Sequence, residues 1–468
     1  MQVIKTDKGY VSGTVIGLPG QETYIFRGIP YAAPPVGDLR WRPPQPARSW
    51  EGIKECTRFS DICPQSVSPN MPPGQMSEDC LYLNVVTPAH KPTAELPVMV
   101  WLHGGGYSMG SGNDAIWNGY RLPQNGVVMV TVTQRLNVFG LAGHPELTKE
   151  SLNHSCGNYL FLDLIAALQW VQKNIAGFGG DPNNVTIFGE SGGGAKVSMM
   201  MATPLAKGLF HRSICESGTA TAILKNKSLQ QIESNGVKFF ETLGVKTLAE
   251  ARKVPWQDVL KANQILEPPM AARQPGTEPE FFWAPVNDGW MLPSSPEEAF
   301  DSGNINAVPL ITFACLGELT GPGPLIMPQI IPEYVKMLEA VEKKGYAGYA
   351  CIFDFVPEYW RKEGGVSAHS TELTYVFGDW DNSSGWWNSI AMFMQTSGAK
   401  TNEVRLGKSE KFISEAMMKI WAQFAKTGKP SVKGLIDWPV YTTSEDKYLY
   451  INEPLQIKPG FSRVAQKK

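Results

Sequence analysis

The sequence predicts an α/β fold built on a mostly parallel sheet that helices cover on both faces. Two short runs, residues 96–102 and 126–133, consist largely of apolar and β-branched residues, which favour strands. In residues 158–175 the apolar side chains recur at intervals of three and four, which is typical of a helix that faces a core. Strands buried on both faces read as continuous apolar runs, so this alternation favours a doubly wound sheet.

Composition is consistent with one large domain over residues 1–468 and argues against several classes of protein. The chain is 43% hydrophobic, which is enough to fill a core. Its net charge of -2 argues against nucleic-acid binding, which needs a basic surface. No apolar run approaches the roughly 20 residues that cross a membrane, and no signal peptide is expected at residues 1–6. Seven cysteines without a CxxC motif argue against zinc and against a disulfide scaffold.

The remaining elements are expected in a regular order along the chain. Residues 1–90 are rich in Pro and Gly, which favours short strands and ordered loops. Residues 184–188 form a predicted strand, residues 189–194 a tight turn, and a helix is expected from Ala195 onward. Two further strands are predicted at residues 308–315 and 349–355. Two further helical segments are predicted at residues 229–260 and 332–344.

The tight turn contains a candidate nucleophile. Residues 189–193 read Gly-Glu-Ser-Gly-Gly and fit the G-x-S-x-G pattern, with a predicted strand before it and a predicted helix after it. On such a sharp turn Ser191 adopts strained backbone angles and lies at a helix N-terminus, where N–H groups stabilise negative charge. An ordinary glycine-rich loop is the alternative, but it does not explain the strand and helix context.

A second glycine motif, His103-Gly104-Gly105-Gly106, follows the strand at residues 96–102. An oxyanion hole needs backbone N–H groups with no side chains in the way, so Gly105 and Gly106 are the expected donors, together with Gly192 after the nucleophile. His103 precedes Ser191 in the chain, which indicates a structural neighbour and not a catalytic base.

The order serine, acid, histidine in this kind of site restricts the choice of base. Of the six histidines, only His211 and His369 follow Ser191. His211 follows too closely to leave room for an acid loop. His369, after the predicted strand at residues 349–355, is therefore the predicted base.

The acid is expected directly after a strand that ends beside the histidine loop. Glu318 follows the strand at residues 308–315 and fits that place. Asp354 is the main alternative, but it lies within a predicted strand. Asp288, in Asn-Asp-Gly, is typical of a turn. Glu318 is therefore the predicted acid.

At this point the chain resembles the type-B carboxylesterase and cholinesterase family of α/β-hydrolases. The resemblance rests on the two glycine motifs together with FRGIPYA at residues 26–32, SEDCLYLN at residues 77–84 and YVFG at residues 375–378. It implies an α/β-hydrolase fold and a serine esterase with Ser191, Glu318 and His369 as triad. It also implies a small ester as substrate, with no metal and no cofactor.

The resemblance implies further roles for single residues. Glu190 and Ser217 match family positions close to the triad. Cys63 and Cys80 match a family disulfide, which would suggest an exported protein. Two buried ion pairs are also expected from matching positions: Arg40 with Glu78, and Arg135 with Asp163.

Two departures from the family concern the substrate. Glu318 and His369 are separated by 369 minus 318, or 51, residues, a short interval that suggests a reduced lid, with residues 229–300 and 319–367 as cap insertions. The loop between Cys63 and Cys80 contains no tryptophan to hold choline. We therefore expect an open site for bulky aromatic esters, such as feruloyl esters.

The walls of this open site are expected from two aromatic segments, Phe281-Phe282-Trp283 and residues 380–387, although large aromatic side chains also commonly fill cores. Two functions remain open from the sequence. One is a serine carboxylesterase, and the other is a catalytically silent binding or adhesion module on the same scaffold. The complete predicted triad favours the enzyme. The oligomeric state stays open.

Overall fold

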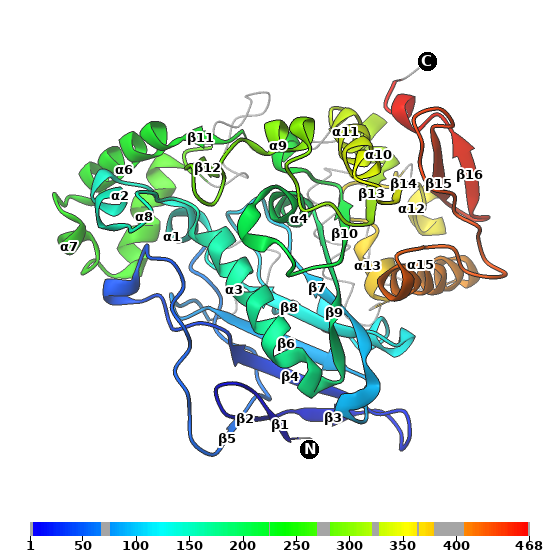
Figure 1. Ribbon diagram of the computed structural model, residues 1–468, viewed down its shortest axis with the longest axis horizontal. Coiled ribbons are helices and arrows are strands. Elements are labelled where there is room, and N and C mark those ends of the chain that lie inside the picture. Colours follow the sequence, from blue (N-terminus) through cyan, green and yellow to red (C-terminus); the bar gives the residue numbers. More distant parts are fainter. Residues whose placement is uncertain are drawn as a thin grey trace.

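The computed structural model describes residues 3–66, 75–223, 225–268, 281–320, 327–362, 365–378 and 407–466. One sheet of eleven strands crosses the described part of the chain, in the order β16-β15-β14-β13-β10-β9-β7-β8-β6-β4-β3 (Figure 1). The strands from β15 to β8 pair in parallel, and the outer ones pair antiparallel. The α/β fold class predicted from the apolar runs is confirmed.

The strands of this sheet are β3 (Thr14–Ile16), β4 (Thr23–Pro30), β6 (Tyr82–Thr87), β7 (Leu96–Trp101), β8 (Val128–Thr133), β9 (Gly180–Glu190), β10 (Arg212–Glu216), β13 (Leu310–Cys315), β14 (Gly348–Phe353), β15 (Lys447–Ile451) and β16 (Gln456–Pro459). Two small sheets stand apart and consist of β1 (Val3–Lys5), β2 (Tyr10–Ser12) and β5 (Ile53–Glu55), and of β11 (Lys227–Ser228) and β12 (Val286–Asn287).

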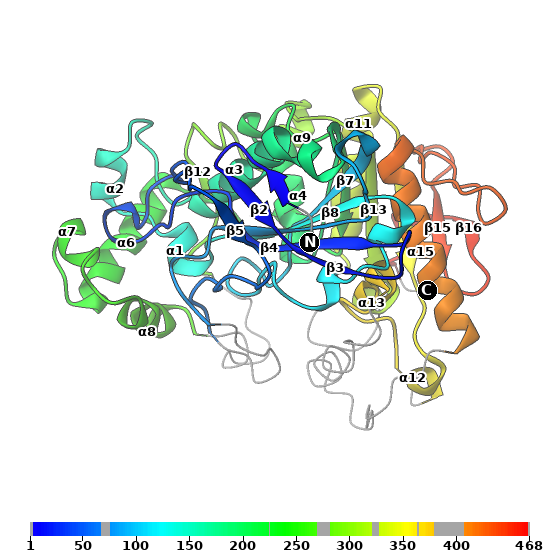
Figure 2. The same cartoon turned by 90° about the horizontal axis from the view of Figure 1, so that it is seen from below.

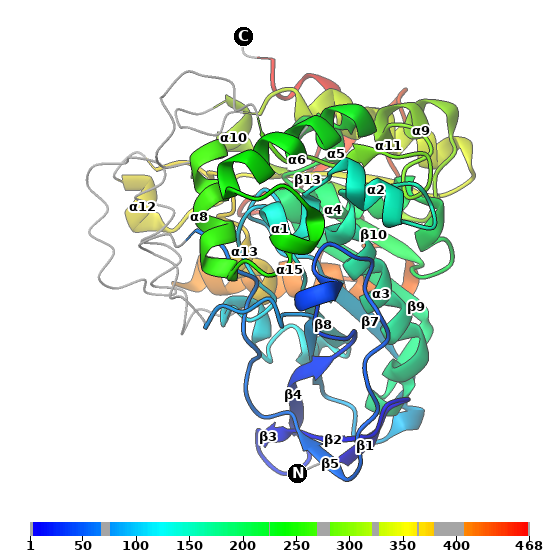
Figure 3. The same ribbon diagram turned by 90° about the vertical axis from the view of Figure 1, so that its left-hand side faces the viewer.

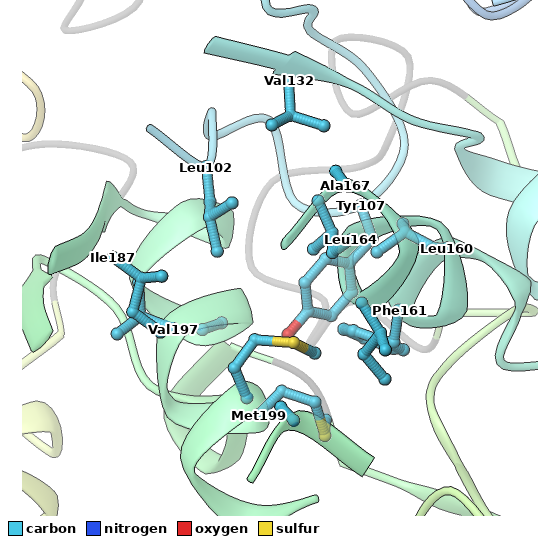
Figure 4. Packing of buried hydrophobic residues seen from close by; sticks show 14 of the residues in the cluster. Leu102, Tyr107, Val132, Leu160, Phe161, Leu164, Ala167, Ile187, Val197 and Met199 are labelled. Atoms are coloured by element: carbon cyan, nitrogen blue, oxygen red, sulfur yellow. The ribbon is translucent and has the colours of Figure 1, made fainter. Parts of the chain in front are cut away.

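Helices cover both faces of the sheet because its strands are apolar on both sides. Along β7, Val98 and Val100 join one buried cluster, whereas Met99 and Trp101 join the other. The first cluster includes α3 (Tyr159–Asn174), α4 (Gly192–Ala202) and α11 (Ile330–Lys343), and the second includes α13 (Leu373–Phe377) and α15 (Lys408–Thr427). Figure 2 shows α3 and α4 on one side of the sheet and α13 on the other. Figure 4 shows α3 and α4 packing together around the ring of Tyr107.

The shorter helices are α1 (Asn137–Leu141), α2 (Pro145–Glu150), α5 (Ala220–Ile223), α9 (Pro296–Ser302), α10 (Leu316–Thr320) and α12 (Glu358–Lys362). Within the described ranges, no helix combines the length and the apolar character that a membrane crossing needs.

Several predicted boundaries are corrected. The helical segment expected at residues 229–260 is three helices, α6 (Leu229–Leu243), α7 (Leu248–Ala251) and α8 (Trp256–Leu266), because Gly244 ends α6 with a φ of 76°. Of these, α6 lies beside α2, and α8 lies beside α1 (Figure 3). Residues 319–367 were expected to be a cap insertion, but they supply β14, which hydrogen-bonds to β13 and β15 in the central sheet. The helix after the nucleophile begins at Gly192, three residues before Ala195.

Cys63 and Cys80 are unbonded and fully buried in the structure, so the disulfide that the family resemblance implied is not confirmed and stays a prediction. The sulfur of Cys63 accepts the backbone N–H of Leu136 at 3.2 Å. Burial raises the pKa of Cys80 well above its usual value, and a hydrogen bond with Cys63 raises it further. Export, which rested on this disulfide, stays a prediction.

Both predicted ion pairs are present and buried. The Arg40 guanidinium donates to the two carboxylate oxygens of Glu78 at 2.6 and 2.5 Å. Arg135 donates to the two oxygens of Asp163 at 2.8 and 2.6 Å. Both guanidinium groups therefore meet their carboxylate in the two-pronged geometry that arginine favours.

Candidate active site

Ser191 lies on a strained turn between β9 and α4. Its φ of 58° and ψ of -123° fall in a region that residues with a side chain rarely occupy. Glycine is required on both sides, because a Cβ on Gly189 or Gly193 would stand 2.4 or 1.9 Å from the carbonyl oxygen of Leu102. The backbone strain predicted for the nucleophile turn is therefore present, and close packing against the end of β7 maintains it.

The three glycines predicted as an oxyanion hole lie beside this turn. A Cβ on Gly192 would stand 2.6 Å from the backbone nitrogen of Gly106, so the two segments touch. Gly105 has a φ of 89°, and a Cβ there would lie 2.2 Å from the carbonyl of Met109. Within the described residues, the N–H groups of Gly105, Gly106 and Gly192 donate to no carbonyl or side chain. Three unused donors therefore gather next to Ser191.

Glu318 lies on α10, directly after β13, and both oxygens of its carboxylate have hydrogen-bond partners. Oε1 accepts the hydroxyl of Ser217 at 2.7 Å and the backbone N–H of Cys315 at 2.8 Å. Oε2 lies 2.6 Å from Nδ1 of His369. The structure therefore brings together the predicted acid and base and places Ser217, as expected, against the acid. These three hydrogen bonds hold the acid in one orientation.

The imidazole of His369 lies between two carboxylates. Nδ1 faces Glu318, and Nε2 lies 3.1 Å from Oε1 of Glu190. Burial lowers the pKa of His369, but the carboxylates of Glu190 and Glu318 raise it more, to about 9. Ser191 Oγ makes no hydrogen bond to any described residue. The predicted base is thus next to the predicted acid, and its free nitrogen points at Glu190 and not at the serine.

Glu190 is buried beside the nucleophile, as the sequence predicted. Its Oε1 also accepts the hydroxyl of Ser370 at 2.5 Å. Burial raises the pKa of Glu190, and the nearby His369 opposes that shift. Ser370 was not singled out from the sequence, although its place directly after His369 is a signal that could have identified it.

Two more buried glutamates behind the site were also missed. Glu216, at the end of β10, accepts the indole N–H of Trp421 at 2.7 Å, and burial raises its pKa to about 8. Glu372 accepts the thiol of Cys315 at 3.1 Å, and burial raises its pKa well above the usual value. Glu372 lies three residues after His369, and this spacing is the one sequence signal for it.

The alternatives to the predicted triad have structural roles. Asp354 accepts the hydroxyls of Tyr450 and of Ser367, the latter at 3.2 Å. Asp288 accepts the backbone N–H groups of its own turn. His211 accepts the N–H of Val185 at 3.1 Å, just before β10 begins and thus at the opposite end of the strand from Glu216. His103 is fully buried, with Nδ1 2.9 Å from the carbonyl of Gly104.

One expectation about the substrate pocket is corrected. Trp283 was expected as an exposed wall, but it is 1% exposed, and its indole N–H donates to Asn263 at 2.6 Å. Its ring also packs edge-on against Phe239 at 5.7 Å, so it belongs to the core around α6 and α8. Phe281 and Phe282 are half-buried against the same core. The second aromatic segment, residues 380–387, lies outside the described residues.

The chain is similar to known esterases along its whole length. The model of the carboxylesterase family matches residues 1–334 and 327–467. Para-nitrobenzyl esterase of Bacillus subtilis is 32% identical over 98% of this chain and 96% of its own length. Carboxylesterase 1C of Rattus norvegicus is 32% identical over 97% of this chain and 90% of its own length.

Two further matches have similar names. Fumonisin B1 esterase of Sphingopyxis macrogoltabida is 38% identical over 64% of this chain and 54% of its own length. A solved structure of a PNB esterase superposes with a TM-score of 0.81 at 29% identity, covering 98% of this chain and 97% of that one. Each of these relatives is named as an esterase, which argues against a silent binding module.

Proposed function

The chain belongs to the carboxylesterase family and is a carboxylic-ester hydrolase, and on this premise we propose that it works through an acyl-enzyme on Ser191 with Glu318 and His369. The observation that carries this proposal is the buried bond of 2.6 Å between Glu318 and His369, beside a strained serine. Such a serine is weak as a nucleophile unless a base takes its proton.

In the proposed reaction, Nε2 of His369 turns from Glu190 to Ser191 and accepts the hydroxyl proton. Ser191 Oγ then bonds to the ester carbonyl, and the negative charge that develops on the carbonyl oxygen meets the unused N–H groups of Gly105, Gly106 and Gly192. The imidazolium gives its proton to the leaving alcohol. Water repeats the sequence on the acyl-enzyme and releases the acid. Glu318 stabilises the imidazolium throughout.

Hydrolysis of a chromogenic aryl acetate tests this proposal. We expect Ser191→Ala to remove turnover and to prevent labelling by a fluorophosphonate, whose mass should otherwise be found on the peptide that contains Ser191. Ser234→Ala, on the exposed face of α6, serves as the matched control and is expected to keep both. Turnover or labelling that persists in Ser191→Ala would refute the assignment of the nucleophile.

The dependence of activity on pH should report the position of His369 between two carboxylates. The base must be neutral to accept a proton, so kcat/KM is expected to rise with pH towards a midpoint near the His369 pKa of about 9. Glu190→Gln removes one carboxylate that raises this pKa and keeps Glu318. Its midpoint is therefore expected at lower pH.

This expectation is checked by measuring kcat/KM for an uncharged ester between pH 5 and pH 10. Glu241→Gln replaces an exposed glutamate on α6 and should leave the midpoint unchanged. An unchanged midpoint in Glu190→Gln would contradict the contact between Glu190 and the imidazole.

We further propose that the site accepts esters with bulky aromatic groups. Two observations support this: the short interval of 51 residues between Glu318 and His369, and the similarity to a para-nitrobenzyl esterase. A short interval leaves little chain for a lid. We expect kcat/KM to stay within about tenfold when acetyl is replaced by cinnamoyl or naphthoyl on the same alcohol. A steeper fall for the large acyl groups would contradict the open site.

A further inference from the structure

Lys196 on α4 has a fully buried ammonium that meets no carboxylate in the part of the chain that the structure describes. The residue is 0% exposed, and Nζ donates to the backbone carbonyl of His103 at 2.8 Å. The side-chain amide of Gln134 also faces Lys196: with its oxygen toward the ammonium it accepts from Nζ at 2.9 Å, and its nitrogen donates to the carbonyl of Val132 at 3.2 Å. Among the described residues, Lys196 forms no ion pair. Its charge is therefore held by neutral oxygens alone.

This arrangement costs stability. A buried charge that is not paired with an opposite charge loses hydration that neutral acceptors replace only in part. Lys196 is also near the N-terminus of α4, where the helix dipole disfavours a cation. Burial accordingly lowers the pKa of Lys196 to about 7. A methionine of similar length would fill the same space without this cost, so packing alone does not account for a lysine here.

Lys196 binds the carbonyl of His103, the residue at which the glycine loop of residues 103–106 begins. The peptide between His103 and Gly104 is planar, so a bond to the carbonyl fixes the orientation of the whole unit. Three glycines follow, and glycine has the freest backbone of all residues. At its other end the loop is held by the Gly105 carbonyl, which accepts the N–H groups of Ser108 and Met109 at 3.0 and 3.1 Å. Lys196 thus holds the end of the loop that follows β7.

This end of the loop also lies close to the nucleophile. A Cβ on Gly104 would stand 3.4 Å from Cβ of Ser191, so the peptide that Lys196 holds packs directly against the serine. The N-terminus of α4 and the buried ammonium both contribute positive potential at this place. That is the sign of potential that stabilises an oxyanion.

We propose that Lys196 is a positioning residue of the oxyanion hole, whose ammonium fixes the peptide between His103 and Gly104 and adds positive potential behind the N–H groups of Gly105 and Gly106. This rests on the proposed acyl-enzyme at Ser191. Lys196 touches neither substrate nor reacting atoms and acts through the loop. Its positive charge is the part of the arrangement that titrates.

The other titratable groups around Lys196 are present in the wild type and in a Lys196 variant alike, so among the described residues the substitution removes the titration of Lys196 alone. His103 is the imidazole that faces it, and burial, together with the charge of Lys196, lowers the pKa of His103 well below its usual value. Two other buried charged groups on the packed elements have partners of their own, Glu190 on β9 with His369 and Asp163 on α3 with Arg135. The carboxyl group of Glu216 on β10 accepts the indole N–H of Trp421.

The first test is kinetic. Lys196→Met is expected to lower kcat for an uncharged aryl ester by about tenfold at pH 6 with little change in KM, since the hole acts on the transition state. The ratio of wild-type to variant kcat should fall as pH rises from 6 to 9, because only the wild type loses a charge there. The titration of His369 is common to both proteins and cancels in the ratio.

The second test separates positioning from structural support. The pKa of Lys196 is lower in the folded state than in the unfolded state. The buried charge therefore lowers the free energy of unfolding of the wild type most below pH 7, and this loss shrinks as pH rises towards 10. Lys196→Met is therefore expected to have a higher Tm than wild type at pH 6, by an amount that shrinks at pH 9. Lys196→Gln, also neutral, should give the same pH dependence of kcat. Met200→Leu, buried on the same helix, is the control and should give a flat ratio.

The outcomes are distinct. An unchanged kcat, a ratio that does not vary with pH, or a Tm that falls together with kcat would each overturn the role of Lys196. If Ser191→Ala is inactive while Lys196→Met equals wild type, this inference alone fails. If Ser191→Ala remains active, the proposed function fails first.

Discussion

Alanine in place of Glu318 is expected to lower kcat by about 10⁴-fold, because the imidazolium of His369 then loses its buried partner. Nδ1 lies 2.6 Å from Oε2 of Glu318, and Ser217 and Cys315 also donate to this carboxylate. The change therefore removes both the charge and the orientation of the base. The measurement is kcat with a chromogenic aryl acetate, together with near-UV circular dichroism to confirm the fold.

Asp354→Asn is the matched control for this prediction, since Asp354 was the main alternative acid and its carboxylate accepts the hydroxyls of Ser367 and Tyr450. It is expected to keep most of the activity. The double variant Ser191→Ala/Glu318→Ala should be little worse than Ser191→Ala alone, because the triad works as a unit. If Glu318→Ala kept wild-type activity while Asp354→Asn lost it, the acid would be Asp354.

The parts of the site that the sequence predicted are those determined by local backbone. Gly189 and Gly193 are required because any Cβ there would collide with Leu102, and a pattern of glycines around one serine records that requirement in five adjacent positions. The choice of Glu318 and His369 followed from chain order and from the strands that precede them. In both cases the signal lay within a few residues of the functional group.

The parts that were missed depend on contacts between segments distant in the chain. Ser370 is 180 positions from Glu190, and its hydroxyl reaches that carboxylate only because the histidine loop packs against the nucleophile turn. The place of Trp283 likewise depends on a contact with another segment of the chain. An aromatic side chain can line a site or fill a core, and the deciding contact with Asn263 becomes visible only after α8 has packed. Lys196 lies just after the recognised motif at residues 189–193, but its burial depends on the loop from β7.

The boundaries of the fold follow the same rule. The strands β7, β8, β13 and β14 were predicted from their continuous apolar runs. β10 was not, because its sequence, Arg-Ser-Ile-Cys-Glu, carries charged residues at both ends. Its place is set by neighbours, since β9 and β13 pair with it on either side. A strand of that kind is determined by the sheet and not by its own residues.

Replacing Arg135 by methionine is expected to cost about 3 to 5 kcal/mol of the free energy of unfolding, because it leaves a buried carboxylate without its partner. The side chains of Arg135 and Asp163 are 2% and 0% exposed. Arg135 also donates to the carbonyl of Arg42 at 2.8 Å, so one substitution removes several hydrogen bonds at once. Urea unfolding followed by fluorescence gives the loss directly from the midpoint at constant slope.

The double variant Arg135→Met/Asp163→Leu shows whether the ion pair itself stabilises the fold, or whether Arg135 is needed only to compensate the buried charge of Asp163. With both charges gone, no ion is left buried, and apolar side chains of similar volume recover most of the loss when they pack well. We therefore expect the double variant to be more stable than Arg135→Met alone. Lys362→Met breaks the exposed pair with Glu358 on α12 and should leave the midpoint unchanged, because solvent screens such pairs. A midpoint for Arg135→Met equal to wild type would contradict the buried geometry, and a double variant less stable than the single one would show that the carboxylate of Asp163 has a further partner to satisfy.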